Sequence, residues 1–222
     1  MRRLFPLLTL LLPGVLFAQD PYLIDWDEVG EEAINHLVNL VRIDSSNPPG
    51  NETEVANYIK AALAEEGIDS DMYALDPDRA NLVARYKGNG SKRPILIMGH
   101  TDVVGVQPEK WDEDPFGGAR KDGWIYGRGT LDDKDNVTAG LMLMIMLNRY
   151  GVEMDRDIIF LAESGEEGTP EVGINYMVEH HWDKIEAEFC LAEGGGNVLE
   201  DTGVSIVGIQ TAEKKPRRAT LV

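Results

Sequence analysis

The chain has 222 residues, of which 43% are hydrophobic and 27% are charged. These proportions are ordinary for a folded globular protein, so a disordered chain is not expected. The formal net charge is −18, from 39 acidic and 21 basic residues. An acidic surface of this kind repels phosphates, and we therefore expect no nucleic acid partner.

Residues 1–18 carry a pattern of their own, M-R-R-L-F-P-L-L-T-L-L-L-P-G-V-L-F-A. Arginines, then an apolar stretch, then a small residue before the cleavage point are the order of a secretory signal peptide. We predict an exported protein, periplasmic or secreted, after cleavage near Ala18. A stable membrane span is not expected, because Pro6 and Pro13 interrupt an apolar run that is short for a spanning helix.

Two helix patterns and three strand patterns come next along the chain. Apolar residues recur at helical spacing over 27–43, and a second helix is predicted from Asn51, which can cap it, to about Glu66 before Gly67. The strand patterns lie at 70–75, 81–87 and 94–99. Residues 105–123, rich in Pro, Gly and Asp, are predicted to form a long loop.

The rest of the chain continues this alternation. Residues 134–149 are nearly all apolar, so this helix should be deeply buried. A strand at 156–163, a helix at 170–181 and a strand at 188–193 follow. Cys190, the only cysteine, lies in the last strand, and we expect it to be a buried small hydrophobe. The alternation favours an α/β domain with a mostly parallel, helix-covered sheet, in which functional groups gather beyond the carboxyl ends of the strands.

Reactive side chains follow three of these apolar strands and precede the buried helix. The groups are His100 with Asp102, Asp132 with Asp133, Glu166 with Glu167, and Glu193. One such group is an ordinary polar turn. Four of them on one rim of a sheet would repel each other unless cations neutralise the carboxylates.

The donor types suit two zinc ions, each of which takes about four N or O ligands. The ligands assigned in this way are His100 for one ion, Asp132 as a bridge, and Glu167 or Glu193 on either side. Asp102 is better suited to accept a hydrogen bond from the far nitrogen of His100. Glu166, free of metal, would take a proton from the attacking water.

The motifs H-T-D-V-V, G-R-G-T-L-D-D-K, G-E-E and A-E-G-G occur in this order. Together they resemble the di-zinc metallopeptidase family of aminoacylases, glutamate carboxypeptidase, acetylornithine deacetylase and succinyl-diaminopimelate desuccinylase. The segments W-D-E-D-P-F-G-G and D-G-W-I-Y-G-R-G are most similar to Gly-X carboxypeptidases and N-acyl-amino-acid hydrolases. The resemblance implies metal ligands at His100, Asp132, Glu167 and Glu193, a general base at Glu166, and Asp102 as the residue that orients the histidine.

The resemblance also implies a reaction. Glu193 stands where dipeptidase-like members tend to carry Asp, which favours an amide next to a free carboxylate as the scissile bond. The implied enzyme is a carboxypeptidase or N-acyl-amino-acid amidohydrolase that acts on a small molecule or peptide through a metal-bound hydroxide and a Glu base. Zinc is the metal of the family, and Co²⁺ or Mn²⁺ could use the same N and O ligands.

One feature of the family pattern is missing. The last metal ligand of the family is a histidine that follows a small lid domain, and this sequence stops at Val222. Residues 203–210, G-V-S-I-V-G-I-Q, resemble the first strand of that lid. We therefore expect the N-terminal part of the catalytic domain over 19–203, the start of a lid or dimerisation domain over 204–222, and a homodimer only for a full-length form.

Two other hypotheses remain open. Without the last histidine, the chain could be a non-catalytic metal-binding fragment or pseudo-enzyme, which would bind zinc weakly and gain no turnover from it. His180 and His181 do not replace that ligand in our reading, because they end a helix in a polar context and are expected on the surface. The other hypothesis is an exported acidic binding domain whose motifs are coincidental.

Overall fold

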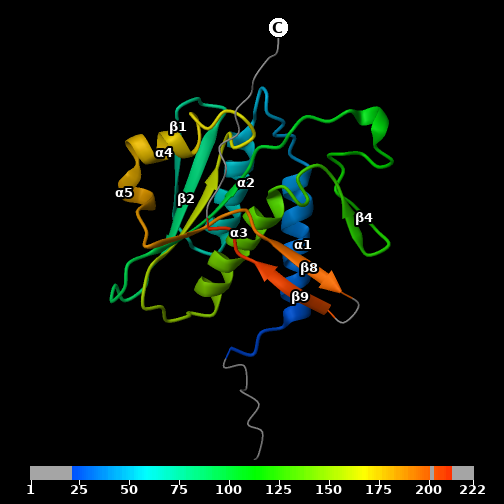
Figure 1. Cartoon of the computed structure of the whole chain (residues 1–222). Helices are drawn as coiled ribbons and strands as arrows, with labels where there is room; N and C mark the ends of the chain where they lie inside the picture. The colour runs from blue at the N-terminus through cyan, green and yellow to red at the C-terminus, as the bar shows by residue number, and fades with distance from the viewer. Residues whose placement is uncertain (1–21, 201–202, 212–222) are drawn as a thin grey trace, which may run out of the picture.

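A five-stranded sheet with helices on both faces forms the centre of the protein (Figure 1). The computed structural model describes residues 22–200 and 203–211, so the predicted signal peptide and the end of the predicted lid segment lie outside the described residues. The strands of the sheet, in spatial order, are β1 (Ser70–Ala74), β2 (Ala80–Tyr86), β6 (Ile158–Glu163), β3 (Ile95–His100) and β7 (Phe189–Leu191).

The sheet is mostly parallel, as predicted. β3 pairs in parallel with both β6 and β7, whereas β2 is antiparallel to both of its neighbours, β1 and β6. Four strands therefore run in one direction and β2 runs in the other. Every residue of β6 is buried, which is the burial pattern of a central strand with helices on both faces.

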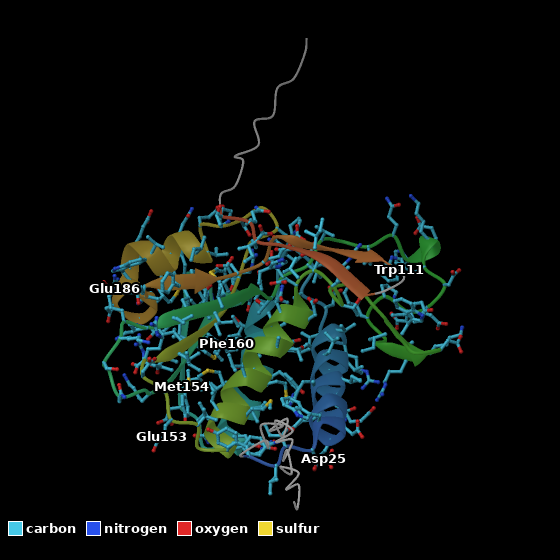
Figure 2. All side chains as sticks on the ribbon, turned by 60° about the horizontal axis from the view of Figure 1, so that its bottom comes forward. Asp25, Trp111, Glu153, Met154, Phe160 and Glu186 are labelled. Atoms are coloured by element: carbon cyan, nitrogen blue, oxygen red, sulfur yellow. The ribbon has the colours of Figure 1, made fainter. Side chains whose placement is uncertain are left out.

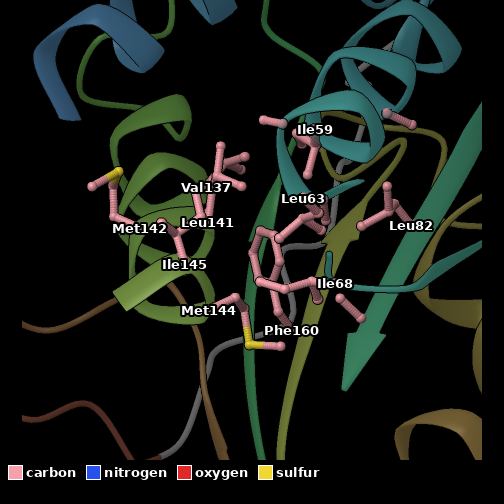
Figure 3. Close-up of a cluster of buried hydrophobic side chains, with 14 of the residues drawn as sticks. Ile59, Leu63, Ile68, Leu82, Val137, Leu141, Met142, Met144, Ile145 and Phe160 are labelled. Carbon is pink, nitrogen blue, oxygen red and sulfur yellow. The ribbon is translucent and has the colours of Figure 1, made fainter. Parts of the chain in front are cut away.

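The two faces of the sheet have separate hydrophobic cores. The larger core packs under three helices, α1 (Trp26–Val41), α2 (Glu52–Glu65) and α3 (Lys134–Arg149). Figure 3 shows Phe160 of β6 between side chains of α3, such as Ile145, and of α2, such as Leu63. The smaller core contains Met177 and Ile185, from α4 (Ile174–His180) and α5 (Trp182–Ile185).

Charged residues lie around these cores. In Figure 2, Phe160 occupies the middle of the molecule, whereas Asp25, Glu153 and Glu186 lie at its periphery. The acidic surplus of the sequence is therefore largely a solvated surface. Within the part of the chain that the structure describes, no helix has the length and apolar character needed to cross a membrane.

The predicted loop at 105–123 is partly wrong, because it contains regular structure. A 3₁₀ turn, η1 (Pro108–Lys110), is followed by β4 (Ala119–Lys121), which forms a hairpin with β5 (Trp124–Tyr126). The hairpin turn is Asp122-Gly123, and both residues have positive φ, at 52° and 82°. Asp-Gly is a strong two-residue hairpin signal, but the flanking strands have only three residues each, too few for an alternating apolar pattern to mark them.

A second hairpin ends the described chain. β8 (Gly196–Glu200), which was not predicted, pairs antiparallel with β9 (Gly203–Gly208), the segment that resembles the start of a lid. Figure 1 shows the hairpin beyond the edge of the central sheet, in front of α1. The domain boundary between residues 203 and 204 stays a prediction.

Three local expectations are wrong. Cys190 is exposed, because β7 has a partner strand on one side only within the described chain. His181 is half-buried, with its ring 4.4 Å from that of Tyr73, whereas His180 is exposed as expected. Asn51 precedes α2, but its side chain makes no capping hydrogen bond and donates instead to the backbone oxygen of Asp44 and to Glu54.

Candidate metal centre and general base

The predicted site residues lie at one edge of the sheet. β3 and β6 are parallel neighbours with His100 opposite Glu163, so the segments that follow both strands begin side by side. The Asp132-Asp133 segment reaches the same edge from the beginning of α3. Gly99 makes this approach possible, because a Cβ atom there would lie 2.8 Å from Asp133 Oδ2.

His100 is the centre of the group, and only 2% of its surface is exposed. Its Nδ1 lies 2.9 Å from the backbone oxygen of Asp102 and 3.4 Å from Asp102 Oδ1. Since a carbonyl oxygen can only accept, Nδ1 carries a hydrogen, and Nε2 is the nitrogen that faces the other carboxylates. Nε2 lies 2.9 Å from Asp132 Oδ1, 3.6 Å from Glu193 Oε2 and 3.9 Å from Glu166 Oε2.

Asp102 is fully buried and holds more than the histidine. Its Oδ1 accepts from the backbone N of Glu166 at 3.1 Å, and its Oδ2 accepts from the backbone N of Glu167 at 3.0 Å. The side-chain amide of Asn47 donates to Oδ2 at 2.8 Å. Asp102 therefore connects His100 to the turn that carries the predicted base, an arrangement that the sequence did not indicate.

The two aspartates before α3 take different positions. The side chain of Asp132 is 56% exposed and faces His100 Nε2. Asp133 is buried, and its carboxylate accepts from the backbone N of His100 at 3.0 Å and from the amide of Asn136. Asp133 was not predicted as a ligand, yet the structure brings both aspartates to the histidine.

The side chains form two groups, and within each group the potential ligand atoms all lie within 4.8 Å of one another. They are His100 with Asp133 and Glu193, and His100 with Glu166 and Glu167. His100 belongs to both groups, whereas Glu193 belongs to one and Glu167 to the other. Asp133 and Glu166 are also members, and Asp132 lies 2.9 Å from His100 Nε2 without being in either group. The individual roles stay predictions. Among the described residues, His100 is the only histidine in these groups.

The electrostatics of the group fit a cation. Burial, followed by the charge of Asp132, raises the pKa of both Glu167 and Glu193. Burial alone would lower the pKa of His100, but the surrounding carboxylates, Asp102 first, raise it to about 10. Crowded carboxylates resist ionisation, and a divalent metal ion would relieve their repulsion.

Glu163, the last residue of β6, is a further carboxyl group at this edge and was not predicted. It is 4% exposed, and its Oε2 has no hydrogen-bond partner among the described residues. Burial raises its pKa to about 8. Together with His100, Glu166 and Glu193, it lines a cavity of about 700 Å³ whose other walls include the apolar residues Met98 and Ile174.

The sequence profile of peptidase family M20/M25/M40 matches residues 96–220, more than half of the chain. The matched segment contains every residue of the two ligand groups. The chain belongs to peptidase family M20/M25/M40. This membership confirms the resemblance drawn from the motifs and places the chain in a family of hydrolytic enzymes.

Individual relatives agree with this assignment. A probable succinyl-diaminopimelate desuccinylase of Staphylococcus epidermidis is 36% identical over 170 residues, which cover 76% of this chain and 40% of the relative. The N-formyl-4-amino-5-aminomethyl-2-methylpyrimidine deformylase of Halalkalibacterium halodurans is 30% identical over 182 residues, with 78% and 42% covered. The crystal structure of an M20 metallo-carboxypeptidase from Sulfolobus solfataricus matches at 25% identity with a TM-score of 0.66, over 78% of this chain and 39% of that one.

These matches, through the Sulfolobus structure, confirm the α/β fold class. They also mean that the chain spans about 40% of the length of the curated relatives that it matches.

Proposed function

We propose that this chain carries the metal ligands and the general base of a metal-dependent hydrolase that cleaves an amide bond. The observation that supports this most directly is the surroundings of His100 Nε2, with Asp132 Oδ1 at 2.9 Å and Glu193 Oε2 at 3.6 Å. A buried imidazole nitrogen that faces several carboxylates is a donor set for a divalent cation. The Sulfolobus relative is a metallo-carboxypeptidase, which supports the same chemistry.

The residues that would hold the metal are His100, Asp132, Glu167 and Glu193, with Asp133 close enough to contribute. We propose a pair of zinc ions, and the same N and O donors would accept Co²⁺ or Mn²⁺. When bound, the metal would act as a Lewis acid on the substrate carbonyl and lower the pKa of the attacking water.

Glu166 is the residue that we assign to proton transfer. Its side chain is 50% exposed, whereas its backbone is held by the hydrogen bond to Asp102. The carboxylate is therefore accessible to an incoming water from a fixed position. It would accept the proton of that water and return it to the leaving amine. Asp102 would keep the Nδ1 hydrogen of His100 turned away from the substrate.

For the substrate, we propose an N-acyl amino acid or a C-terminal peptide with a free carboxylate next to the scissile amide. The names of the two curated relatives describe removal of an acyl group, succinyl in one and formyl in the other. The carboxypeptidase relative supports a free carboxylate. Glu193 also favours a substrate with a free carboxylate, because carboxypeptidase-like and aminoacylase-like members of the family carry Glu at this position.

The base is tested by Glu166→Gln in the protein isolated at its natural length. We expect normal zinc content and a loss of turnover of about 10²–10⁴-fold, the usual contribution of a general base. Glu179→Gln is the control, because Glu179 lies on α4 with 71% of its side chain exposed. Zinc content and hydrolysis of N-acyl amino acids are measured on the same samples. Near-normal turnover by Glu166→Gln would contradict the assignment.

The substrate class needs a separate comparison. N-formyl, N-acetyl and N-succinyl amino acids are each tested with a free and with an amidated carboxyl group. We expect cleavage of the free acids only, because a site that recognises a carboxylate leaves its own polar groups unpaired when the charge is absent. Equal cleavage of both forms would reject the carboxylate requirement alone. Zinc binding without turnover on any of them would favour the non-catalytic metal-binding alternative.

Export is a further proposal, supported by the charge and hydropathy order of residues 1–18. Amino-terminal sequencing of the native protein should then begin near Gln19. A protein that retains Met1 inside the cell would contradict it.

A further inference from the structure

A buried ion pair beneath the site has no role in the proposed chemistry. Glu52, the first residue of α2, is fully buried, and Arg79, just before β2, is 6% exposed. Arg79 Nε and Nη2 donate to the two carboxylate oxygens of Glu52, at 2.5 and 2.6 Å. Moving two charged side chains from water into the protein interior has a large desolvation cost. A protein with apolar residues at these two positions would often be as stable. What the pair contacts is therefore informative.

Both ends of the 165–169 turn, which carries Glu166 and Glu167, contact this pair. At the beginning of the turn, the backbone N of Gly165 donates to Glu52 Oε1 at 3.2 Å. At its end, the hydroxyl oxygen of Thr169 accepts from Arg79 Nη2 at 2.9 Å. The turn also closes on itself, because the backbone N of Thr169 donates to the backbone oxygen of Gly165 at 2.9 Å.

The middle of the turn joins the same system through Asp102. The amide nitrogen of Asn47 donates to both Asp102 Oδ2 and Thr169 Oγ1, each at 2.8 Å. Asp102 in turn accepts from the backbone N of Glu166 and of Glu167. A continuous chain of hydrogen bonds therefore runs from the ion pair to the two glutamates.

The backbone around Arg79 is also shaped for it. Gly50 has a φ of +91°, and a Cβ atom at this position would lie 2.1 Å from Arg79 Nε. The loop between α1 and α2 thus leaves room for the guanidinium group only because residue 50 is glycine.

We propose that Arg79, held by Glu52 and acting through Thr169, is a positioning residue that fixes the backbone of Glu166 and Glu167. Such a residue is needed because neighbouring carboxylates repel each other. A turn that presents two of them together must be held in place by other contacts. A planar guanidinium suits this task, because its fork reaches Glu52 and Thr169 at the same time. The effect of this positioning on turnover rests on the proposed function, whereas its effect on the backbone of the turn does not.

The test compares Thr169→Val with Thr169→Ser. Valine keeps the shape of threonine and removes the hydroxyl oxygen, whereas serine keeps that oxygen. We expect the amide hydrogens of Glu166 and Glu167 to exchange about tenfold faster in Thr169→Val than in the parent protein, with Thr169→Ser unchanged. Amide exchange is followed by NMR, with Leu161 in the centre of β6 as the reference for global opening.

Two further measurements extend the test to function. Affinity for Co²⁺, read from its visible absorption, should fall about tenfold in Thr169→Val, because its ligands lose their fixed spacing. In a protein that turns over, kcat should fall by about tenfold with KM within about threefold. If neither the parent protein nor any variant hydrolyses a substrate, the proposed function is rejected. Amide hydrogen exchange and Co²⁺ affinity still decide whether Arg79 positions the turn.

Arg79→Lys tests the same contact from the other side. It retains the charge next to Glu52 but cannot reproduce the fork. Unchanged exchange at Glu166 and Glu167 in both Thr169→Val and Arg79→Lys would overturn the proposal. Equal acceleration at Leu161 would also overturn it, because the contacts would then support the fold as a whole and not the turn.

Discussion

At the scale of single residues, buried polar side chains define the geometry around the site. Asn81, in β2, is fully buried and bonds to three backbone groups. Its amide nitrogen donates to the backbone oxygens of Tyr73 and Val172, at 3.2 and 2.8 Å, and its oxygen accepts from the backbone N of Ser164 at 3.0 Å. One side chain thus joins β1, the end of β6 and the segment before α4.

Asn81→Ala should therefore be strongly destabilising. Three backbone groups would lose their partners in a buried place, and we expect a loss of about 3 kcal/mol in the free energy of unfolding, near 1 kcal/mol for each. Urea denaturation measures this change. Asn35→Ala, on the exposed side of α1, is the control and should stay within about 0.5 kcal/mol of the parent protein. A loss below about 1 kcal/mol for Asn81→Ala would contradict the argument.

At the scale of elements, the approach of α3 to the sheet depends on a glycine. Gly140 lies in the middle of α3 and is buried. A Cβ atom there would lie 2.3 Å from Cε2 of Phe160, the ring at the centre of the larger core. Helix propensity disfavours glycine by about 1 kcal/mol relative to alanine, so its presence is explained by packing and not by local preference.

Gly140→Ala should consequently destabilise the protein although alanine favours a helix. We expect the free energy of unfolding to fall by about 1–3 kcal/mol, because overpacking against Phe160 outweighs the gain in helix propensity. Gly30→Ala is the matched control in α1, where a Cβ atom meets nothing within 4 Å. This variant should gain up to about 1 kcal/mol. Thermal unfolding of the two variants gives the comparison, and shifts of the same sign would refute it.

At the scale of the whole molecule, the large excess of acidic residues links folding to pH. The chain has 39 Asp and Glu residues, and those paired in the folded state must be protonated when acid unfolds it. Asp157, beside the start of β6, accepts from Lys87 at 2.9 Å, from Arg85 at 3.1 Å and from the backbone N of Gly88 at 2.9 Å. Burial alone would raise the pKa of Asp157, but these donors, Lys87 first, lower it overall.

The sign of the pH effect follows from that lowered pKa. A carboxyl group with a lower pKa in the folded state stabilises the fold above its unfolded pKa, about 3.9, and this stabilisation is lost as the pH falls through the folded value. Asp157→Asn should therefore lower the free energy of unfolding by about 1 kcal/mol at pH 6–8. Below about pH 4, the difference in this free energy between the variant and the parent protein should shrink. Urea denaturation across this range measures it. A difference that stays constant down to pH 3 would disprove the linkage.

Much of the fold was predictable from the sequence, because the information is local. The helical spacing of apolar residues marked α1, α2 and α3, and runs of buried residue types marked β2, β3 and β6. Polar residues directly after apolar strands indicated where the site would lie, since the carboxyl ends of parallel strands share one edge. Family membership followed from the order of the motifs along the chain.

The tertiary structure decided what depends on neighbours distant in sequence. Cys190 reads as a buried strand residue, but its exposure depends on whether another strand covers β7. Asn47 and Arg79 look like ordinary loop residues, and they join the site only because the fold brings them to Thr169, 122 and 90 residues away. Sequence patterns record which face of an element is apolar. They do not record which polar groups meet across elements, because that depends on distances between segments that only the packed fold sets.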